Sequence, residues 1–153
     1  MKVRDLMTAN PLTCSPRDSL ATAAMHMWDG DCGLVPVVDD GQILGVLTDR
    51  DICMALLFKG ATASAVTVAE VINGAIYSCS PDDEVAEAIR IMRNHQVHRL
   101  PVVEDGRLEG LLSLNDVVLE AQAESGHEHR PTYRQVMDAM QGICAHRQMP
   151  AVV

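Results

Sequence analysis

Val97-His-Arg-Leu-Pro-Val-Val-Glu-Asp-Gly-Arg-Leu-Glu-Gly-Leu-Leu-Ser-Leu-Asn-Asp116 is the stretch that decides the fold of this chain. It predicts a β-hairpin that runs into a helix. Leu100 to Val103 and Leu108 to Leu112 are apolar runs of strand length. The turn between them, Glu104-Asp105-Gly106, lets Gly106 take a positive φ, as a tight hairpin turn requires.

Polar groups stand at both ends of this hairpin. Ser113 is suited to cap the helix that follows the second strand, and Asp116 comes three residues later. His98 and Arg99 come directly before the first strand. A hydroxyl, a carboxylate and a His-Arg pair suit a sugar and its phosphate, because hydrogen bonds to charged groups are the strong ones.

The same pattern occurs earlier in the chain. A shift of 65 residues lays residues 3–52 over residues 68–117 without gaps, and 16 of the 50 aligned pairs are identical. Cys14-Ser15-Pro16 falls on Cys79-Ser80-Pro81, and Pro36-Val37-Val38 falls on Pro101-Val102-Val103. The matches concentrate at turns and helix caps, where backbone geometry restricts the choice of residue. An internal duplication therefore fixes the architecture.

Each copy predicts the order short strand, helix, strand, strand, helix. In the first copy we expect a helix capped by Ser15 that ends before Gly30, strands over Leu34 to Val38 and Ile43 to Leu47, and a second helix from about Thr48. In the second copy, Ser80 is the expected cap of the first helix. Its expected apolar stripe is Val85, Ala88, Ile89 and Met92. The fold class is α+β, with two β-α-β-β-α units packed sheet to sheet so that each buries the apolar face of the other.

A further helix is expected after the duplication. Thr132 and Gln135 form a capping box ahead of an apolar stripe at helical spacing, which consists of Tyr133, Val136, Met137, Met140, Ile143 and Cys144. This helix packs on the pair or on a second copy, or it docks another protein. The expected domains are residues 1–60, residues 66–123 and a C-terminal helix over 130–149.

Composition excludes several classes of function. The formal net charge is −9, so most of the surface repels nucleic acid and anionic membranes, and any phosphate must be held by a local group of donors. Aromatic residues make up 3% of the chain, which removes the stacking platforms of single-strand binders. No apolar run approaches the ~18 residues of a membrane span. We expect neither a nucleic acid nor a membrane as partner.

The cysteines indicate a reducing compartment. There are five, with no C-x-x-C spacing, which favours neither a disulfide framework nor a structural zinc site. The N-terminus lacks the apolar core of a signal peptide, so we expect a cytoplasmic protein. Cys14 and Cys79 precede expected helix caps, where a lowered thiol pKa or a simple packing role both fit. His127 and His129 lack a third partner, and we expect no metal site.

The paired units resemble a tandem of CBS domains, the regulatory modules found in cystathionine β-synthase, inosine-monophosphate dehydrogenase and the γ subunits of AMP-activated protein kinase. The resemblance covers about residues 3 to 121. Its motif is an apolar strand with Pro-Val-Val, an acidic-Gly turn, and then Gly, two apolar residues and Ser/Thr-x-x-Asp. Leu34 to Asp51 and Leu100 to Asp116 both match it. In that family, adenosine nucleotides bind in the clefts between the paired units.

The resemblance implies a set of ligand-binding residues. Asp51 and Asp116 match the aspartates that accept hydrogen bonds from ribose hydroxyls, and Thr48 and Ser113 match hydroxyls that face sugar or phosphate. His98-Arg99 before Pro101 resembles the phosphate-contacting pair of the kinase γ subunits. The complete expected set is Thr48, Arg50, Asp51, His98, Arg99, Pro101, Ser113, Asn115 and Asp116.

The two copies differ in one part of this motif. Gly33-Leu34 stands where His98-Arg99 stands in the second copy, which leaves Arg50 as the nearby donor of the first. We therefore expect unequal clefts, with Val97 to Asp116 as the better equipped half-site and one nucleotide held well per pair. The sequence does not assign Arg99 to either cleft.

Plainer interpretations of these residues stay open. Asp51 and Asp116 also suit the first turn of any helix, Thr48 and Ser113 are N-caps in either case, Arg99 suits a surface ion pair, and His98 suits a strand edge.

The leading hypothesis is a non-enzymatic regulatory module that binds AMP, ADP or ATP, needs no other cofactor, and changes the activity of a protein partner. S-adenosylmethionine or NAD is the alternative ligand. No catalytic motif stands out, although an enzyme with unrecognised chemistry is a third class. The alternative function is a scaffolding or dimerisation protein with vestigial clefts. Met25, Trp28, Met54 and Phe58 exceed what one core stripe needs, which predicts a homodimer.

Overall fold

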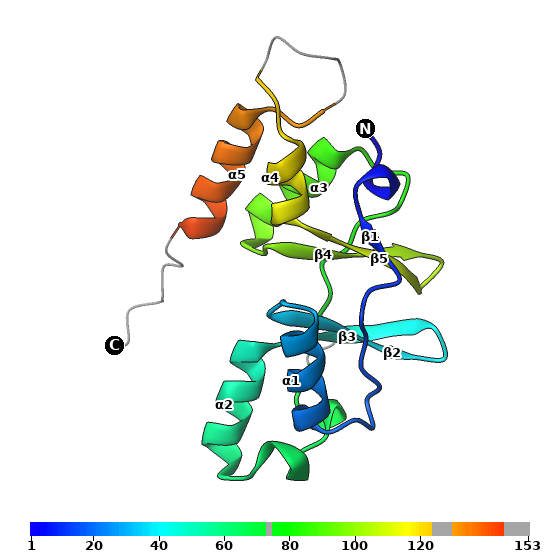
Figure 1. Ribbon diagram of the computed structural model, residues 1–153, viewed down its shortest axis with the longest axis vertical. Helices are drawn as coiled ribbons and strands as arrows, with labels where there is room; N and C mark the ends of the chain where they lie inside the picture. Colours follow the sequence, from blue (N-terminus) through cyan, green and yellow to red (C-terminus); the bar gives the residue numbers. More distant parts are fainter. Residues whose placement is uncertain (73–74, 124–129, 146–153) are drawn as a thin grey trace.

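The computed structural model describes residues 1–72, 75–123 and 130–145, and it shows an α+β fold. The helices are α1 (Leu20–Asp29), α2 (Asp49–Lys59), α3 (Val85–His95), α4 (Leu114–Glu120) and α5 (Tyr133–Cys144). The strands are β1 (Thr8–Ala9), β2 (Leu34–Asp39), β3 (Gln42–Thr48), β4 (Arg99–Glu104) and β5 (Arg107–Ser113). Short 3-10 helices are η1 (Val3–Asp5), η2 (Ala63–Ala65) and η3 (Val68–Glu70). Figure 1 shows the β-hairpins in the middle, with α1 and α2 on one side and α3, α4 and α5 on the other.

The two hairpins have the same register. Leu34 pairs with Thr48 in β2 and β3, Arg99 pairs with Ser113 in β4 and β5, and each hairpin carries a bulge at the same place. Gly106 has a φ of 78°, which confirms the predicted turn. The hairpins meet at their turns, where the Gly106 carbonyl accepts from the Ile43 N–H at 3.1 Å. Together with β1, which pairs with β5, they form one antiparallel sheet.

The predicted caps of the first helix in each unit are wrong. α1 begins at Leu20, and its N-cap is Ser19, whose Oγ accepts from the Thr22 N–H at 3.1 Å. Ser15 belongs instead to a separate turn, in which Asp18 Oδ2 accepts from the Ser15 N–H at 2.8 Å. The second unit repeats this arrangement, since α3 begins at Val85 after another such turn at Ser80.

Each turn forms backbone hydrogen bonds with the segment around the start of the other copy of the repeat. The Pro16 and Asp18 carbonyls accept from the Ala69 and Val68 N–H groups at 2.9 and 2.8 Å, and the Leu20 N–H donates to Val66. In the second unit, the equivalent bonds run from Arg4 to Pro81, from Val3 to Asp83 and from Val85 to Met1. A helix that began at Pro16 would need the Leu20 N–H for the Pro16 carbonyl. These tertiary bonds therefore decide where α1 and α3 begin.

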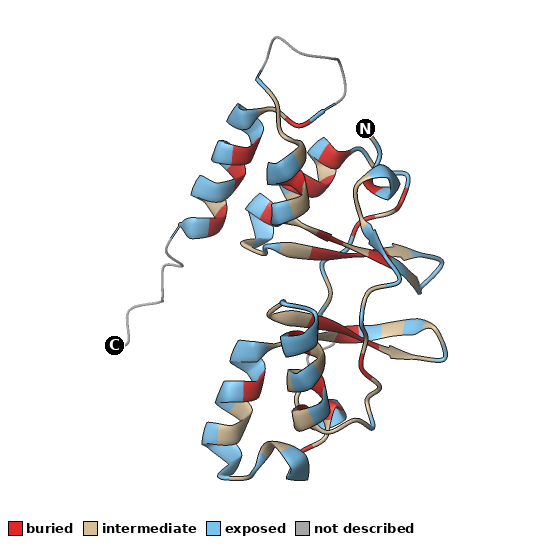
Figure 2. Ribbon diagram, viewed as in Figure 1, coloured by how far each residue is buried: buried red, intermediate tan, exposed pale blue. Residues whose placement is uncertain are grey.

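Two buried clusters form the core, one for each unit (Figure 2). The cluster of the first unit includes Val66 and Val68, which lie around the start of the second copy of the repeat. The cluster of the second unit includes Val3, the first residue of the first copy. The predicted stripe of the second unit, Val85, Ala88, Ile89 and Met92, is buried as expected. Because each unit completes its core with a segment from beside the other, the pair folds as one body.

α5 packs on the second unit. Its capping box is present, and Val136, Ala139 and Ile143 join the core of that unit. Of the expected apolar stripe, Val136 and Ile143 are buried, whereas Tyr133, Met137, Met140 and Cys144 are exposed. The helix covers Tyr133–Cys144 rather than 130–149, and residues 146–149 lie outside the described residues.

Candidate functional site

Two clefts lie between the units. The larger, with a volume of about 690 Å³, is bounded by the end of β3, the start of α2 and the segment that leads into β4. We call it the His98 cleft. The smaller, of about 370 Å³, is bounded by the end of β5, the start of α4, the segment that leads into β2 and residues 8 to 12. We call it the Asp116 cleft. The two are related by the duplication, since each joins the end of one hairpin to the segment before the other.

The helix starts at these clefts are fixed by capping boxes. Asp51 Oδ2 accepts from the Thr48 N–H at 2.9 Å and from Thr48 Oγ1 at 2.7 Å, and Thr48 Oγ1 accepts from the Asp51 N–H. Ser113 and Asp116 repeat this geometry at 2.8 and 2.7 Å. One carboxylate oxygen of each aspartate is therefore engaged locally, and Oδ1 is the oxygen that remains for a ligand.

The structure divides the expected residues between the two clefts. Those in the wall of the His98 cleft are Thr48, Arg50, His98, Arg99 and Pro101. Those in the wall of the Asp116 cleft are Arg99, Ser113, Asn115 and Asp116. Asp51 is exposed and is not part of the His98 wall. The stretch Val97 to Asp116 thus contributes to both clefts, and Arg99 reaches both of them.

The sequence reasoning missed Asp49, which lines the His98 cleft. Its N–H donates to the Gly33 carbonyl at 3.1 Å, and the equivalent bond in the second unit runs from Leu114 to His98 at 2.8 Å. A Cβ atom on Gly33 would lie 2.9 Å from Asp49 Oδ2. The absence of a side chain at residue 33 therefore leaves room for the Asp49 carboxylate. The sequence did contain a signal for Asp49. The first copy has Gly33 where the second has His98, and it has Asp49 where the second has Leu114.

Tyr77 and Gln96 also line the His98 cleft and were not foreseen. The Tyr77 ring stacks on His95 with 3.8 Å between ring centroids and 18° between planes. Tyr77 lies in the second copy between Val68 and Cys79, a stretch in which no residue is identical to its counterpart in the first copy. Its position 65 residues after Leu12, which lines the Asp116 cleft, was the available signal.

The charged residues of the two clefts differ in sign. With neutral histidine, Arg50 and Arg99 against Asp49 give the His98 cleft a net charge of +1. Arg99 against Asp31 and Asp116 gives the Asp116 cleft a net charge of −1. The His98 cleft therefore suits an anionic group, and the N-terminus of α2 at its edge adds a favourable dipole.

The sequence model of the CBS domain matches residues 3–58 and residues 68–122, which is most of the chain. The chain belongs to the CBS-domain family. The two matches correspond to the two units, so the protein contains a tandem CBS pair, as the sequence motif indicated.

Curated relatives and solved structures agree with this assignment. The CBS domain-containing protein YhcV of Bacillus subtilis is 34% identical over 117 residues, 76% of this chain and 83% of the relative. Hypoxic response protein 1 of Mycobacterium tuberculosis is 33% identical over 115 residues, 74% of this chain and 80% of the relative. A structure of Hypoxic Response Protein I with two coordinated zinc ions has a TM-score of 0.71 at 32% identity, covering 78% of this chain and 98% of that one.

A more distant structure shows the fold alone. The CBS domain pair of protein MJ0100, in complex with 5′-methylthioadenosine and S-adenosyl-L-methionine, has a TM-score of 0.69 at 24% identity, covering 78% of this chain and 94% of that one.

The described residues contain neither a metal-binding cluster nor a membrane-spanning helix. Residues 1–72, 75–123 and 130–145 contain no group of three or more His, Cys, Asp or Glu residues that could hold a metal ion. His127 and His129 lie outside the described residues. In the described part of the CBS pair, no helix is both long and apolar enough to cross a membrane.

Cys14 and Cys79, the buried free cysteines at equivalent positions of the two units, have a packing role. Burial raises the pKa of Cys14 to about 11, and burial raises the pKa of Cys79 to about 12. Each forms an isolated bridge to the strand beside it, with Val37 and with Val102 respectively. Thiols with such pKa values are protonated at neutral pH, so the expected possibility of a lowered pKa is wrong for both.

Proposed function

We propose that this CBS pair is a non-enzymatic regulatory module that binds an adenosine nucleotide, AMP, ADP or ATP, between its two units. A cytoplasmic protein partner then responds to the change, and no other cofactor is required. The observation that carries the proposal is the arrangement of both clefts, each with a capping hydroxyl at its wall and the Arg99 guanidinium within reach.

The His98 cleft is the proposed place for the phosphates. Arg50, His98 and Arg99 supply donors there, and the guanidinium fork matches the geometry of phosphate oxygens. The negative charge of the Asp49 carboxylate repels a phosphate, but the carboxylate can accept hydrogen bonds from ribose hydroxyls. The Asp51 carboxylate remains a proposed ribose acceptor for a ligand that extends past the cap of α2.

The Asp116 cleft is the proposed place for a weaker or less anionic ligand. Asp116 Oδ1 and Ser113 suit ribose hydroxyls, and Asn115 suits a neutral polar group. Two carboxylates against one guanidinium disfavour a triphosphate. S-adenosylmethionine carries a sulfonium cation, so this cleft tolerates it better than ATP.

A ligand in either cleft contacts both units at once. The wall of the His98 cleft combines Thr48 of the first unit with His98 of the second, and the Asp116 cleft combines Asp116 with Leu34. A ligand that prefers one relative position of the units therefore shifts the pair toward it, which is the change we propose the partner reads.

The decisive experiment is a calorimetric titration of the full chain with AMP, ADP, ATP, NAD and S-adenosylmethionine. We expect saturable binding of at least one adenosine nucleotide, with one site occupied more tightly than the other. Folded protein that binds none of the five would refute the proposal. Arg17→Ala is a matched control, because Arg17 is exposed and pairs with Asp39 outside both clefts.

A scaffolding protein with vestigial clefts is the second candidate, and it also uses the homodimer that we propose for this chain. The observation that favours it is the exposed apolar surface on α1, α2 and α5, because such patches mark interaction sites. A Thr48→Ala, Ser113→Ala double variant distinguishes the ligand-binding function from the scaffolding function. If nucleotide raises the melting temperature of the wild type and not that of the variant, the ligand-binding function holds. If it raises neither, the scaffold function holds.

A further inference from the structure

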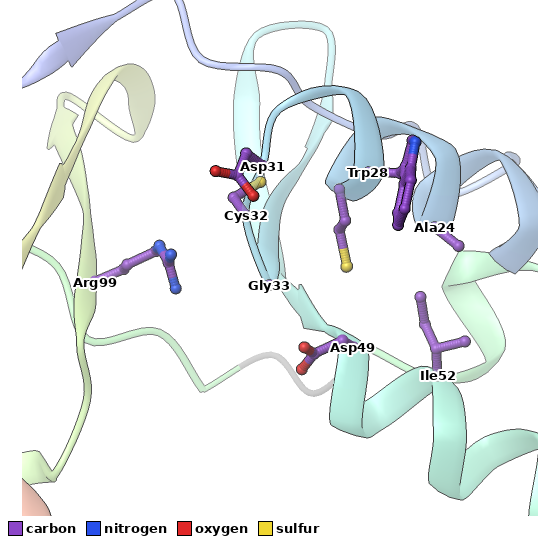
Figure 3. A pocket seen from close by; sticks show the side chains of 9 residues that line it. Ala24, Trp28, Asp31, Cys32, Gly33, Asp49, Ile52 and Arg99 are labelled. Atoms are coloured by element: carbon purple, nitrogen blue, oxygen red, sulfur yellow. The ribbon is translucent and has the colours of Figure 1, made fainter. Parts of the chain in front are cut away.

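An open groove of about 430 Å³ lies between α1 and α2 on the first unit, and we call it the α1/α2 groove. Figure 3 shows Ala24, Trp28 and Ile52 close together at one end, while Asp31, Asp49 and Arg99 lie toward the other. Trp28, in the wall of the groove, is unusually exposed for its type, at 82%. Outside the groove lining, α1 and α2 also carry the exposed apolar residues Met25, Met54, Leu57 and Phe58.

The second unit shows what covers such a groove. The duplication places Met92 and Val117 at the positions of Met27 and Ile52, and both share one buried cluster with Val136, Ala139 and Ile143 of α5. Arg93 stands at the position of Trp28, and Gly142 of α5 lies directly against its side chain. The groove between α3 and α4 is therefore filled by a helix, whereas the equivalent α1/α2 groove is open.

α5 has a second apolar face that its own unit leaves exposed. Tyr133, Met137, Met140 and Cys144 follow each other at intervals of four, three and four residues, so they form one stripe along the helix. We call this the outward stripe. The adjoining face of α5, with Val136, Ala139 and Ile143, already packs on the second unit, so the outward stripe is the part of the apolar surface of α5 that its own chain leaves uncovered.

The helices α5 and α2, which carry the uncovered surfaces, lie on the same flank of the molecule. In Figure 1, α5 and α2 both stand at the left, at opposite ends of the long axis. A two-fold axis across the long axis, on this flank, brings α5 of each copy to α2 of the other. The contact is then made twice and closes, as isologous dimers do. A second copy therefore satisfies both faces in one step, which an unrelated partner does not.

We propose that the chain forms a two-fold dimer in which the outward stripe of α5 of each copy covers the α1/α2 groove of the other. This inference rests on the proposed homodimer and adds the surfaces that form it. It also assigns a role to the helix outside the repeat, because α5 then lies between the second unit of its own chain and the first unit of the other.

The test measures self-association of the full chain without nucleotide by sedimentation equilibrium. Trp28→Glu places a charge in the groove, and Met137→Glu places one on the outward stripe. We expect each to weaken dimerisation by at least about tenfold, because a buried unpaired charge is costly and tryptophan is enriched among interface hot spots. Leu44→Glu is the control, since Leu44 is 40% exposed on β3 and should leave dimerisation unchanged. Ala24→Glu, also in the groove lining, and Met140→Glu replace any variant that circular dichroism shows to be unfolded.

Mixing the two variants tests the pairing itself. A mixed dimer restores one of the two contacts, between the groove of the Met137→Glu copy and α5 of the Trp28→Glu copy. We expect the mixture to associate more tightly than either variant alone. A Met137→Glu protein that dimerises like the wild type, or a mixture no tighter than its components, overturns this pairing but not the homodimer. A wild type that is monomeric at micromolar concentration overturns both.

Discussion

The segment before β4 supplies His98 and Arg99 to one cleft, whereas the equivalent segment before β2 supplies Asp31 and Leu34 to the other. The two clefts share a backbone plan, with hairpins of the same register and helices that begin with the same capping box. Their charges are nevertheless +1 and −1. Positions that the fold does not restrict therefore decide which ligand each cleft accepts, and the pair can carry two sites of different preference.

Arg99 is the residue that the two clefts have in common, so its removal should have the largest effect. We expect Arg99→Ala to weaken nucleotide binding about 10- to 100-fold, which corresponds to about 1.5–3 kcal/mol for a hydrogen bond to a charged group. Both binding steps should weaken, because the guanidinium reaches both clefts. Calorimetric titration of the full chain measures this, with Arg17→Ala as the control. An effect on one step alone would mean that Arg99 serves a single cleft.

Arg50 and Asp116 distinguish the clefts, and their effects should be smaller. We expect Arg50→Gln to weaken ATP binding roughly 2- to 5-fold, since Arg50 is exposed and its charge is partly screened. Asp116→Asn should leave the tighter ATP step unchanged and weaken the other one, because an NH2 group, which cannot accept a hydrogen bond from a ribose hydroxyl, then replaces Asp116 Oδ1. Asparagine keeps an oxygen acceptor for the Ser113 cap. If the two variants instead affect the same binding step, the division of charge between clefts does not determine occupancy.

The sequence was informative where local backbone chemistry is decisive. The duplication, the positive φ of Gly106 and the caps at Thr48, Ser113 and Thr132 were all foreseen, because turns and caps restrict residue type over three or four positions. The burial of α3 was foreseen for the same kind of reason, since its stripe has a regular helical period.

Long-range contacts explain what the sequence left open. Ser15 has the composition of an N-cap, yet Val66 and Val68 take the backbone groups that would begin a helix there. The division of Val97 to Asp116 between two clefts is also a long-range effect. The pairing of Arg99 with Ser113 brings both ends of the hairpin together, and the first unit supplies the opposite wall of each cleft. Asp49 entered the His98 cleft because residue 33 is glycine, and no local pattern reports a contact between residues 33 and 49.

The smallest expected effect concerns the two segments that complete the cores. Glu70 holds η3, accepting from the Thr67 N–H and Oγ1 at 2.8 Å each and from Lys59 Nζ at 3.3 Å. The hydrogen bonds from Thr67, and then the one from Lys59, lower the pKa of Glu70 to about 2. In η1, the equivalent Asp5 accepts from the Lys2 N–H at 2.9 Å. The first unit therefore gains more from its capping carboxylate than the second does.

Glu70→Gln tests this difference through pH. The pKa of Glu70 in the folded protein is about 2, below its ordinary value of 4.5, so its contribution to stability is complete above pH 4.5 and is lost as pH falls toward 2. We expect the variant to unfold at a lower urea concentration than the wild type at pH 7. Between about pH 5 and pH 3 the two midpoints should converge, because protonation removes from the wild type the charge that the variant lacks. A gap in urea midpoint that stays constant down to pH 3 would show that Glu70 acts through its shape and not through its charge.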